Sequence, residues 1–215
     1  AAFIARQKQV LYVSGEESVS QVKLRAERLG AVDSENLQLA SSNSAEDIAA
    51  SIQTGQYNLV IVDSIQTLSL AEISSAPGSV SQITNSSNVI IRAAKAANTA
   101  VILVGHVTKE GSIAGPKVLE HLVDVVLNFE GDRYGGFRVV RAQKNRYGST
   151  NEAAIFEMHE DGLQIVANPS ASLLAERQNL DGSIVLATME GARPLLVEIQ
   201  ALVNPTNFGY PKRAA

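Results

Sequence analysis

Residues 58–63 read NLVIVD, and this stretch decides the fold. It is a continuous apolar run without polar alternation, which is typical of a strand covered on both faces of a parallel sheet. Residues 100–105 (AVILVG) predict another buried strand of this kind. Residues 9–14 (QVLYVS) form a short β-rich run that stops at Gly15, and residues 37–40 predict one more strand.

Helical patterns lie between these strands. Apolar residues recur at helical spacing from 19 to 29, a helix is expected from Ser44 to Gly55, and another from 82 to 98. Strands that alternate with helices favour a doubly wound α/β sheet. The serine-rich connection over residues 69–84 is too long for a routine turn and is a candidate functional loop.

The pattern changes after residue 122. Strand-like runs follow one another across turns that contain glycine, which indicates an antiparallel extension of the parallel sheet. Asn168 and Pro169 mark a boundary. Beyond it we expect a short helix and two strands, which are too few to bury a core of their own and therefore open a second domain. The expected strands and helix are 123–128, 137–143, 153–158, 163–166, 172–176, 183–188 and 195–201.

Composition excludes several classes of protein. The 215 residues are 45% hydrophobic and 19% charged, as in an ordinary globular protein, and the net charge of −4 means that any nucleic-acid site must be local. Cysteine is absent, so these residues hold no disulfide and no cysteine-based zinc site. We find no apolar run long enough for a bilayer span and no signal peptide, and expect a cytoplasmic protein without a membrane partner.

Polar residues follow three of the predicted parallel strands. Asp63 ends one strand at the edge where open α/β sheets place ligands, and it resembles a Walker B aspartate that holds Mg²⁺ through water. A strand-end aspartate that caps the next turn is the alternative. Glu16 could serve as a general base, whereas Glu17 more simply favours the following helix N-terminus. His106 could sense a phosphate or be structural.

Two cationic segments come later in the chain. Lys109, with Gly111 and Gly115, lies in a basic loop that suits contact with a phosphate backbone and equally suits an ordinary solvated loop. Lys144 and Arg146 flank an amide directly after a strand, so they could clamp phosphates or form a solvent-exposed turn.

Five segments of the chain form a distinctive set. Four of them are VLYVSGEES (10–18), LVIVDSIQT (59–67), GHVTKEGSIAGPKVLEHLVD (105–124) and FEGDR (129–133), and the most specific is KNRYG (144–148). Together they resemble the bacterial RadA/Sms family, whose KNRFG signature is similar to KNRYG with Tyr147 in place of phenylalanine. The resemblance covers nearly the whole chain.

This resemblance implies a RecA-like ATPase core, with a mostly parallel sheet flanked by helices, that uses ATP and Mg²⁺. It implies a homo-hexameric ring that drives branch migration on single-stranded or branched DNA in recombination and repair, with a recombinase as partner. Residues 1–168 would be part of this core, and residues 169–215 the start of a Lon-protease-like α+β domain. The family's zinc finger would lie N-terminal to these residues.

The resemblance also implies roles for individual residues. Glu16 corresponds to the catalytic glutamate, Asp63 to the Walker B acid with Ser64 beside it in the nucleotide site, and His106 to the γ-phosphate sensor. The remaining four residues are cations: Lys109 and Lys117 fall in a DNA-facing loop, and Lys144 and Arg146 match the signature's cations, which act on ATP at a subunit junction or on DNA.

One departure from the family pattern is important. No G-x-x-x-x-G-K-[ST] phosphate loop is present, and the chain begins in what would be the helix after that loop. We therefore expect that these residues alone neither bind nor hydrolyse ATP appreciably. Two alternatives stay open, a different RecA-superfamily ATPase, such as a circadian-clock or replicative-helicase relative, and a non-catalytic scaffold that keeps the fold without turnover.

Overall fold

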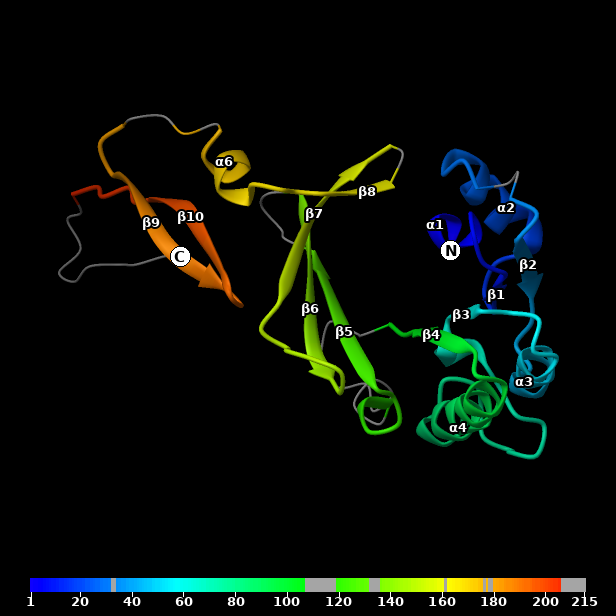
Figure 1. Cartoon of the computed structure of the whole chain (residues 1–215). Helices are drawn as coiled ribbons and strands as arrows, with labels where there is room; N and C mark the ends of the chain where they lie inside the picture. The colour runs from blue at the N-terminus through cyan, green and yellow to red at the C-terminus, as the bar shows by residue number, and fades with distance from the viewer. Residues whose placement is uncertain are drawn as a thin grey trace. The chain divides into compact units, whose positions relative to one another are not determined.

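The computed structural model describes residues 1–31, 34–106, 119–131, 136–160, 162–175, 177 and 180–205 (Figure 1). The chain divides into two compact units. The first comprises Ala1–Val126 with Lys144–Tyr147, and the second comprises Leu127–Gln143 with Gly148–Ala215. Each unit has a hydrophobic core of its own.

A four-stranded parallel sheet forms the centre of the first unit. Its strands are β1 (Val10–Ser14), β2 (Leu37–Ser41), β3 (Leu59–Asp63) and β4 (Ala100–Val104), and they lie in the order β2-β1-β3-β4. Because every pair in this sheet is parallel, all four strands end at the same edge. The predicted α/β class with a parallel sheet is confirmed.

Side-chain caps define where the helices of this unit begin. Ser18 accepts a hydrogen bond from the Gln21 amide at the start of α2 (Val19–Arg28), and Ser44 accepts one from the Asp47 amide at 3.0 Å at the start of α3 (Ala45–Gln53). Helix α4 (Val80–Ala97) is followed by Asn98, which adopts the left-handed conformation that favours helix termination. A short helix, α1 (Ala2–Ala5), precedes β1.

The larger core lies between the sheet and helices α3 and α4. Val60 and Val62 of β3 are fully buried there, together with Ile48 and Ile52 of α3 and Ile90 of α4. On the opposite face of the sheet, α1 covers a smaller cluster of Ala5, Val10, Leu59 and Ile61. The apolar run of residues 58–63 is therefore buried on both sides, as predicted.

Strand β4 differs from the prediction of a buried strand. Ile102 is 49% exposed, although Val101 and Leu103 pack against the larger core. The reason is the strand order, because β4 is the last strand of this sheet in the described residues and α1, with only four residues, reaches Leu59 and Ile61 but leaves Ile102 uncovered.

The serine-rich connection between β3 and α4 is held by one buried amide. It starts with the 3-10 turn η1 (Ile65–Thr67). The side chain of Gln82, which is 1% exposed, accepts a hydrogen bond from the Leu70 amide at 2.9 Å and donates to the carbonyls of Ile73 and Ser75 at 2.9 and 3.0 Å. The loop is therefore fixed through its backbone.

The second unit contains a four-stranded sheet in the order β5-β6-β7-β8. The β6–β7 and β7–β8 pairs are antiparallel, which confirms the predicted antiparallel strands. The first two residues of β5 and the last two of β6 belong to the first unit. The strands are β5 (Val125–Gly131), β6 (Phe137–Asn145), β7 (Ala153–His159) and β8 (Gly162–Ile165).

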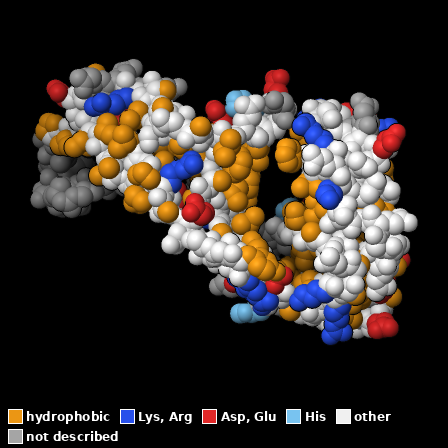
Figure 2. Space-filling view, viewed as in Figure 1, with side chains coloured by type: hydrophobic (Ala, Val, Ile, Leu, Met, Phe, Trp, Pro, Cys, Tyr) orange, Lys and Arg blue, Asp and Glu red, His pale blue; other side chains and the backbone are white. Residues whose placement is uncertain are grey.

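The two faces of this sheet differ. Phe137 and Ile155 are buried on one face, against Val166 and Leu195. Met158 pairs with Leu163 and Phe156 with Ile165, so these side chains share the other face, where Met158 and Ile165 are more than half exposed. Figure 2 shows hydrophobic side chains gathered over these strands.

The C-terminal elements of the second unit share its core. Helix α6 (Pro169–Leu174) is capped by Asn168, and β9 (Ser183–Glu190) and β10 (Arg193–Gln200) form an antiparallel hairpin. Arg141 of β6 pairs with Glu190 of β9 at 2.6 Å and with Glu130 of β5. The predicted domain boundary after residue 168 falls inside this unit and stays a prediction, as does the Lon-like character of the region that follows.

None of the helices in the described residues is both long enough and apolar enough to cross a membrane.

The core of the first unit yields a stability prediction. Ile90→Ala should lower the free energy of unfolding by about 2–5 kcal/mol, because Ile90 is fully buried against the sheet and its removal leaves a cavity. Leu24→Ala on α2 is the control, since Leu24 is 63% exposed and its loss should change stability by no more than about 0.5 kcal/mol. Urea unfolding followed by circular dichroism measures both, and equal effects would contradict this core.

Candidate functional site

The register of the parallel sheet aligns the ends of three strands. Ser14 pairs with Asp63, and Asp63 pairs with Val104, so the last residues of β1, β3 and β4 lie in one row. The chain leaves the sheet immediately after each of them. Residues 15–17, 64–67 and 105–106 therefore share one rim, at the edge where open α/β sheets bind ligands.

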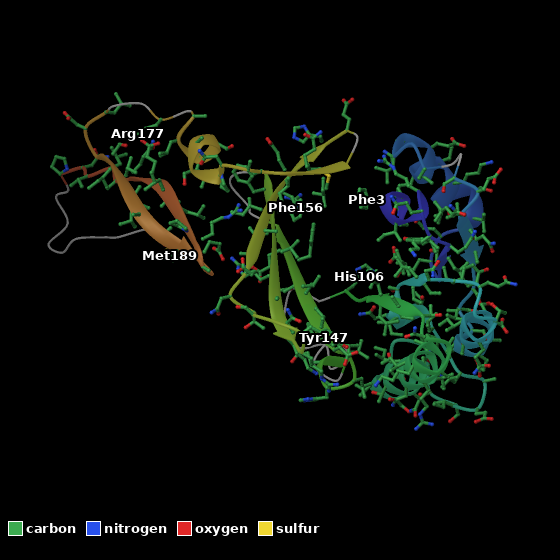
Figure 3. All side chains as sticks on the ribbon, viewed as in Figure 1. Phe3, His106, Tyr147, Phe156, Arg177 and Met189 are labelled. Atoms are coloured by element: carbon green, nitrogen blue, oxygen red, sulfur yellow. The ribbon has the colours of Figure 1, made fainter. Side chains whose placement is uncertain are left out.

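Three of the predicted site residues meet at this rim, because Ser64 and His106 both approach the carboxylate of Glu16. Ser64 is fully buried, and its hydroxyl donates a hydrogen bond of 2.8 Å to Oε1 of Glu16. Nε2 of His106 lies 3.6 Å from the same oxygen, which is beyond hydrogen-bond length but within ion-pair range for a protonated imidazole. Figure 3 shows His106 at the end of β4. Glu16, Ser64 and His106 thus form one cluster, half exposed to solvent at Glu16 and His106.

Asp63 lies next to this cluster and has a partner of its own. The Tyr12 hydroxyl donates a hydrogen bond to Oδ2 of Asp63. Burial and this hydrogen bond raise the pKa of the Tyr12 phenol well above its usual range, so the phenol keeps its proton and remains a donor at neutral pH. The sequence alone did not identify Tyr12, because its side chain meets Asp63 only through the pairing of β1 with β3.

The loops at the rim pack closely against each other. A Cβ on Gly15 would lie 2.0 Å from Oγ1 of Thr67, so a side chain cannot be placed there without moving Thr67. The Gly15 amide donates to the carbonyl of Asp63 at 2.8 Å, and the Thr67 hydroxyl donates to the carbonyl of Ser64 at 2.7 Å. Glycine at position 15 is therefore required by this close approach.

Gln66 connects β3 to β4 at the rim. Its Nε2 donates to the carbonyl of His106 at 3.0 Å, while Oε1 is buried without a hydrogen-bond partner in the part of the chain that the structure describes. Neither Gln66 nor Thr67 was among the predicted site residues, although both lie in the quoted segment LVIVDSIQT.

Glu17 differs from its neighbour Glu16. Oε1 of Glu17 accepts from Arg25 at 2.7 Å, which ties Glu17 to α2, and its backbone amide donates to Oγ of Ser14 at 2.9 Å. These contacts agree with the structural interpretation of Glu17 made from the sequence.

The cations of KNRYG bind to residues 120–124, which precede β5. Nζ of Lys144 donates to the carbonyls of Glu120 and Val123 at 2.5 and 2.8 Å. Arg146 pairs with the carboxylate of Asp124 at 2.9 Å, and its amide donates to the carbonyl of the same residue. Tyr147 is 80% exposed, and Figure 3 shows its position. Lys109 and Lys117 lie outside the described residues.

The oxygen donors at the rim fit a hard cation. Asp63 and Glu16 supply carboxylates, whereas the described residues contain no group of three or more acidic or histidine side chains that could hold a metal by themselves. Magnesium suits such an incomplete set, since it keeps several waters and takes phosphate oxygens as further ligands.

Comparison with known proteins places this rim in a family. Residues 2–112, which contain all four strands of the parallel sheet, match the AAA domain. The chain belongs to the AAA domain family.

Curated relatives extend the similarity along the chain. It is 55% identical to the DNA repair protein RadA of Bacillus subtilis (strain 168) over 96% of its length, and 54% identical to that of Streptococcus pneumoniae (strain ATCC BAA-255 / R6) over 95%. The chain spans 45% and 49% of these two relatives, respectively. The resemblance to RadA inferred from the motifs is thereby confirmed.

Solved structures support the fold. The RadB recombinase superposes with a TM-score of 0.53 at 20% identity, covering 76% of this chain and 81% of the other. A KaiC-like protein from Pyrococcus horikoshii OT3 superposes with a TM-score of 0.59 at 13% identity, covering 77% and 79%. These similarities show a RecA-like fold, as predicted.

The close approach at Gly15 can be tested. Gly15→Ala should destabilise the protein by about 1–3 kcal/mol, because the new methyl group overlaps Thr67. Gly105→Ala is the matched control, since a Cβ there would lie 3.6 Å from Gln66, an ordinary contact, and should change stability by no more than about 0.5 kcal/mol. Urea unfolding measures both variants, and a neutral Gly15→Ala would refute the contact.

Proposed function

We propose that these residues are part of the motor subunit of an ATP-dependent DNA repair and recombination protein. The observation that carries the proposal is the single rim at which Glu16, Ser64, Asp63 and His106 follow three adjacent parallel strands. The similarity to RadA proteins over nearly the whole chain supports it independently.

Glu16 acts as the general base in this proposal. A carboxylate at the rim can orient a water molecule and accept its proton as the water attacks a terminal phosphate. The hydrogen bond from buried Ser64 holds one oxygen of Glu16 in place. His106, whose Nε2 lies 3.6 Å from that oxygen, serves in this proposal as the sensor of the terminal phosphate.

Asp63 would hold the nucleotide's Mg²⁺ through a water ligand, with Ser64 beside it in the nucleotide site. The metal would supply charge neutralisation for the phosphates. The chain's own contribution is to orient the Asp63 carboxylate, which accepts a hydrogen bond from Tyr12 and follows the buried residues 59–62 of β3.

The DNA side of the proposed function rests on the later cations. We assign Lys109 and Lys117 to contact with the phosphate backbone of single-stranded or branched DNA. Lys144 and Arg146 act on ATP at a subunit junction or on DNA, and in the described state they are held by carbonyls and by Asp124. Hydrolysis in a homo-hexameric ring would then drive branch migration in a cytoplasmic recombination complex that includes a recombinase.

The sequence lacks a phosphate loop, so we propose that residues 1–215 alone bind ATP weakly at most. The second candidate function is a non-catalytic scaffold that keeps the fold without turnover. Measuring ATP hydrolysis by the full-length gene product distinguishes the two candidate functions.

Residues 169–215 begin a Lon-like domain in the proposed organisation.

The role of Glu16 is tested by paired variants in the full-length gene product. Glu16→Gln should lower the rate of ATP hydrolysis by about 10²–10⁴-fold while nucleotide binding is kept, because the amide cannot accept the proton. Glu17→Gln is the matched control, since Glu17 pairs with Arg25, and it should keep most of the activity. Equal loss in both variants, or none in Glu16→Gln, would refute the assignment.

The role of Lys144 is tested in the same protein. Lys144→Ala should reduce DNA-stimulated hydrolysis more than it reduces the melting temperature, if the ammonium group acts on phosphate as proposed. Because Lys144 also binds two carbonyls, a drop in the melting temperature alone would show that the residue is structural. Lys95→Ala in the last turn of α4 is the control for removal of a surface cation.

A further inference from the structure

Tyr12 is the one tyrosine of the described residues whose hydroxyl reaches an acid at the rim. It lies in the middle of β1, two residues before the strand ends. We propose that Tyr12 is a positioning residue that fixes the Asp63 carboxylate, so that one oxygen is held by the phenol and the other is presented to a water ligand of the nucleotide's magnesium. This inference rests on the proposed function.

The sheet register explains how Tyr12 reaches Asp63. Tyr12 pairs with Ile61, and Ser14 pairs with Asp63. Alternate residues of a strand share a face, so Tyr12, Ile61 and Asp63 lie on the same side of the sheet. The phenol therefore extends along the sheet toward its carboxyl edge and meets Oδ2 of Asp63 from the neighbouring strand.

The ring of Tyr12 is itself held in place. It packs against the cluster of Ala5, Val10, Leu59 and Ile61 that fills the space beneath α1. Packing of the ring limits the positions that the Tyr12 hydroxyl can take. Its hydrogen bond therefore restricts the Asp63 carboxylate more than a hydrogen bond from a flexible side chain would.

The chemistry of the pair suits this role. A hydrogen bond from a neutral hydroxyl to a carboxylate is among the stronger hydrogen bonds in proteins. It leaves the charge of Asp63 in place, unlike an ion pair with lysine or arginine, which would compete with a cation for the carboxylate. Groups that orient metal-binding carboxylates in this way commonly tune the affinity of the site.

Tyr57 offers a matched comparison. Its hydroxyl donates to Oε1 of Gln38 at 2.6 Å, so it too joins one strand region to a polar side chain of another. Gln38 lies in β2, the strand at the opposite edge of the sheet from β4, and two strands away from β3. Loss of this hydroxyl removes one tyrosine hydrogen bond of the same unit without affecting the rim.

The experiment uses Tyr12→Phe and Tyr57→Phe in the full-length gene product. Affinity for Mn²⁺ is measured by electron paramagnetic resonance in the presence of a non-hydrolysable ATP analogue, and the Mg²⁺ dependence of hydrolysis is measured separately. For Tyr12→Phe we expect Mn²⁺ affinity to fall and the Mg²⁺ requirement to rise by about tenfold, the low end of what loss of such an orienting group costs. Excess Mg²⁺ should restore most of the rate.

Each other outcome has a defined meaning. If Tyr12→Phe is folded and its metal affinity stays within twofold of the parent, or if Tyr57→Phe has the same effect, the inference is wrong. If the parent protein itself binds no metal with the ATP analogue, the proposed function fails before Tyr12 is tested. If Tyr12→Phe does not fold, a crystal structure of the parent with Mg²⁺ and the analogue decides, because absence of the Tyr12–Asp63 hydrogen bond there would overturn the inference.

Discussion

The parallel register of β1, β3 and β4 is the constraint on which the site depends. Parallel strands that end in one row deliver the residues that follow them to a common edge, whatever those residues are. Here they are Glu16, Ser64 and His106, with Asp63 as the last residue of the central strand. A shift of one residue in the pairing of β1 with β3 would turn Tyr12 to the other face and separate it from Asp63.

The loops that form the rim are connected to one another by close contacts. The loop after β1 packs against the turn after β3, because Gly15 lies close to Thr67. Gln66 joins that turn to the end of β4 through its hydrogen bond to the carbonyl of His106. The three loops are therefore connected in series through the turn at residues 65–67. Because Ile65 is fully buried, this turn is anchored in the core.

Local patterns predicted what depends on local chemistry. The apolar run of residues 58–63 implied a strand covered on both faces, and Ser44 followed by Asp47 implied the start of α3, since these signals are set by neighbours in the sequence. The exposure of Ile102 depends on strand order, and the contact of Tyr12 with Asp63 depends on register. The pairing of Lys144 with carbonyls of residues 120 and 123 depends on tertiary folding. The periodicity of the sequence contains no information on the exposure of Ile102, the Tyr12–Asp63 contact or the Lys144 contacts. The roles of the rim residues remain predictions.

The buried amide of Gln82 has a consequence for how the serine-rich connection can diverge. Gln82 binds only main-chain groups of residues 70, 73 and 75, so these hydrogen bonds do not depend on which side chains those positions carry, although Leu70 also packs against the larger core. Surface properties of the loop, such as charge or a docking motif, could therefore be exchanged by substitution while its path is preserved. A designer who wished to graft a new recognition sequence beside the rim would keep Gln82 and Ser79, which caps α4, and vary exposed positions such as Ser74.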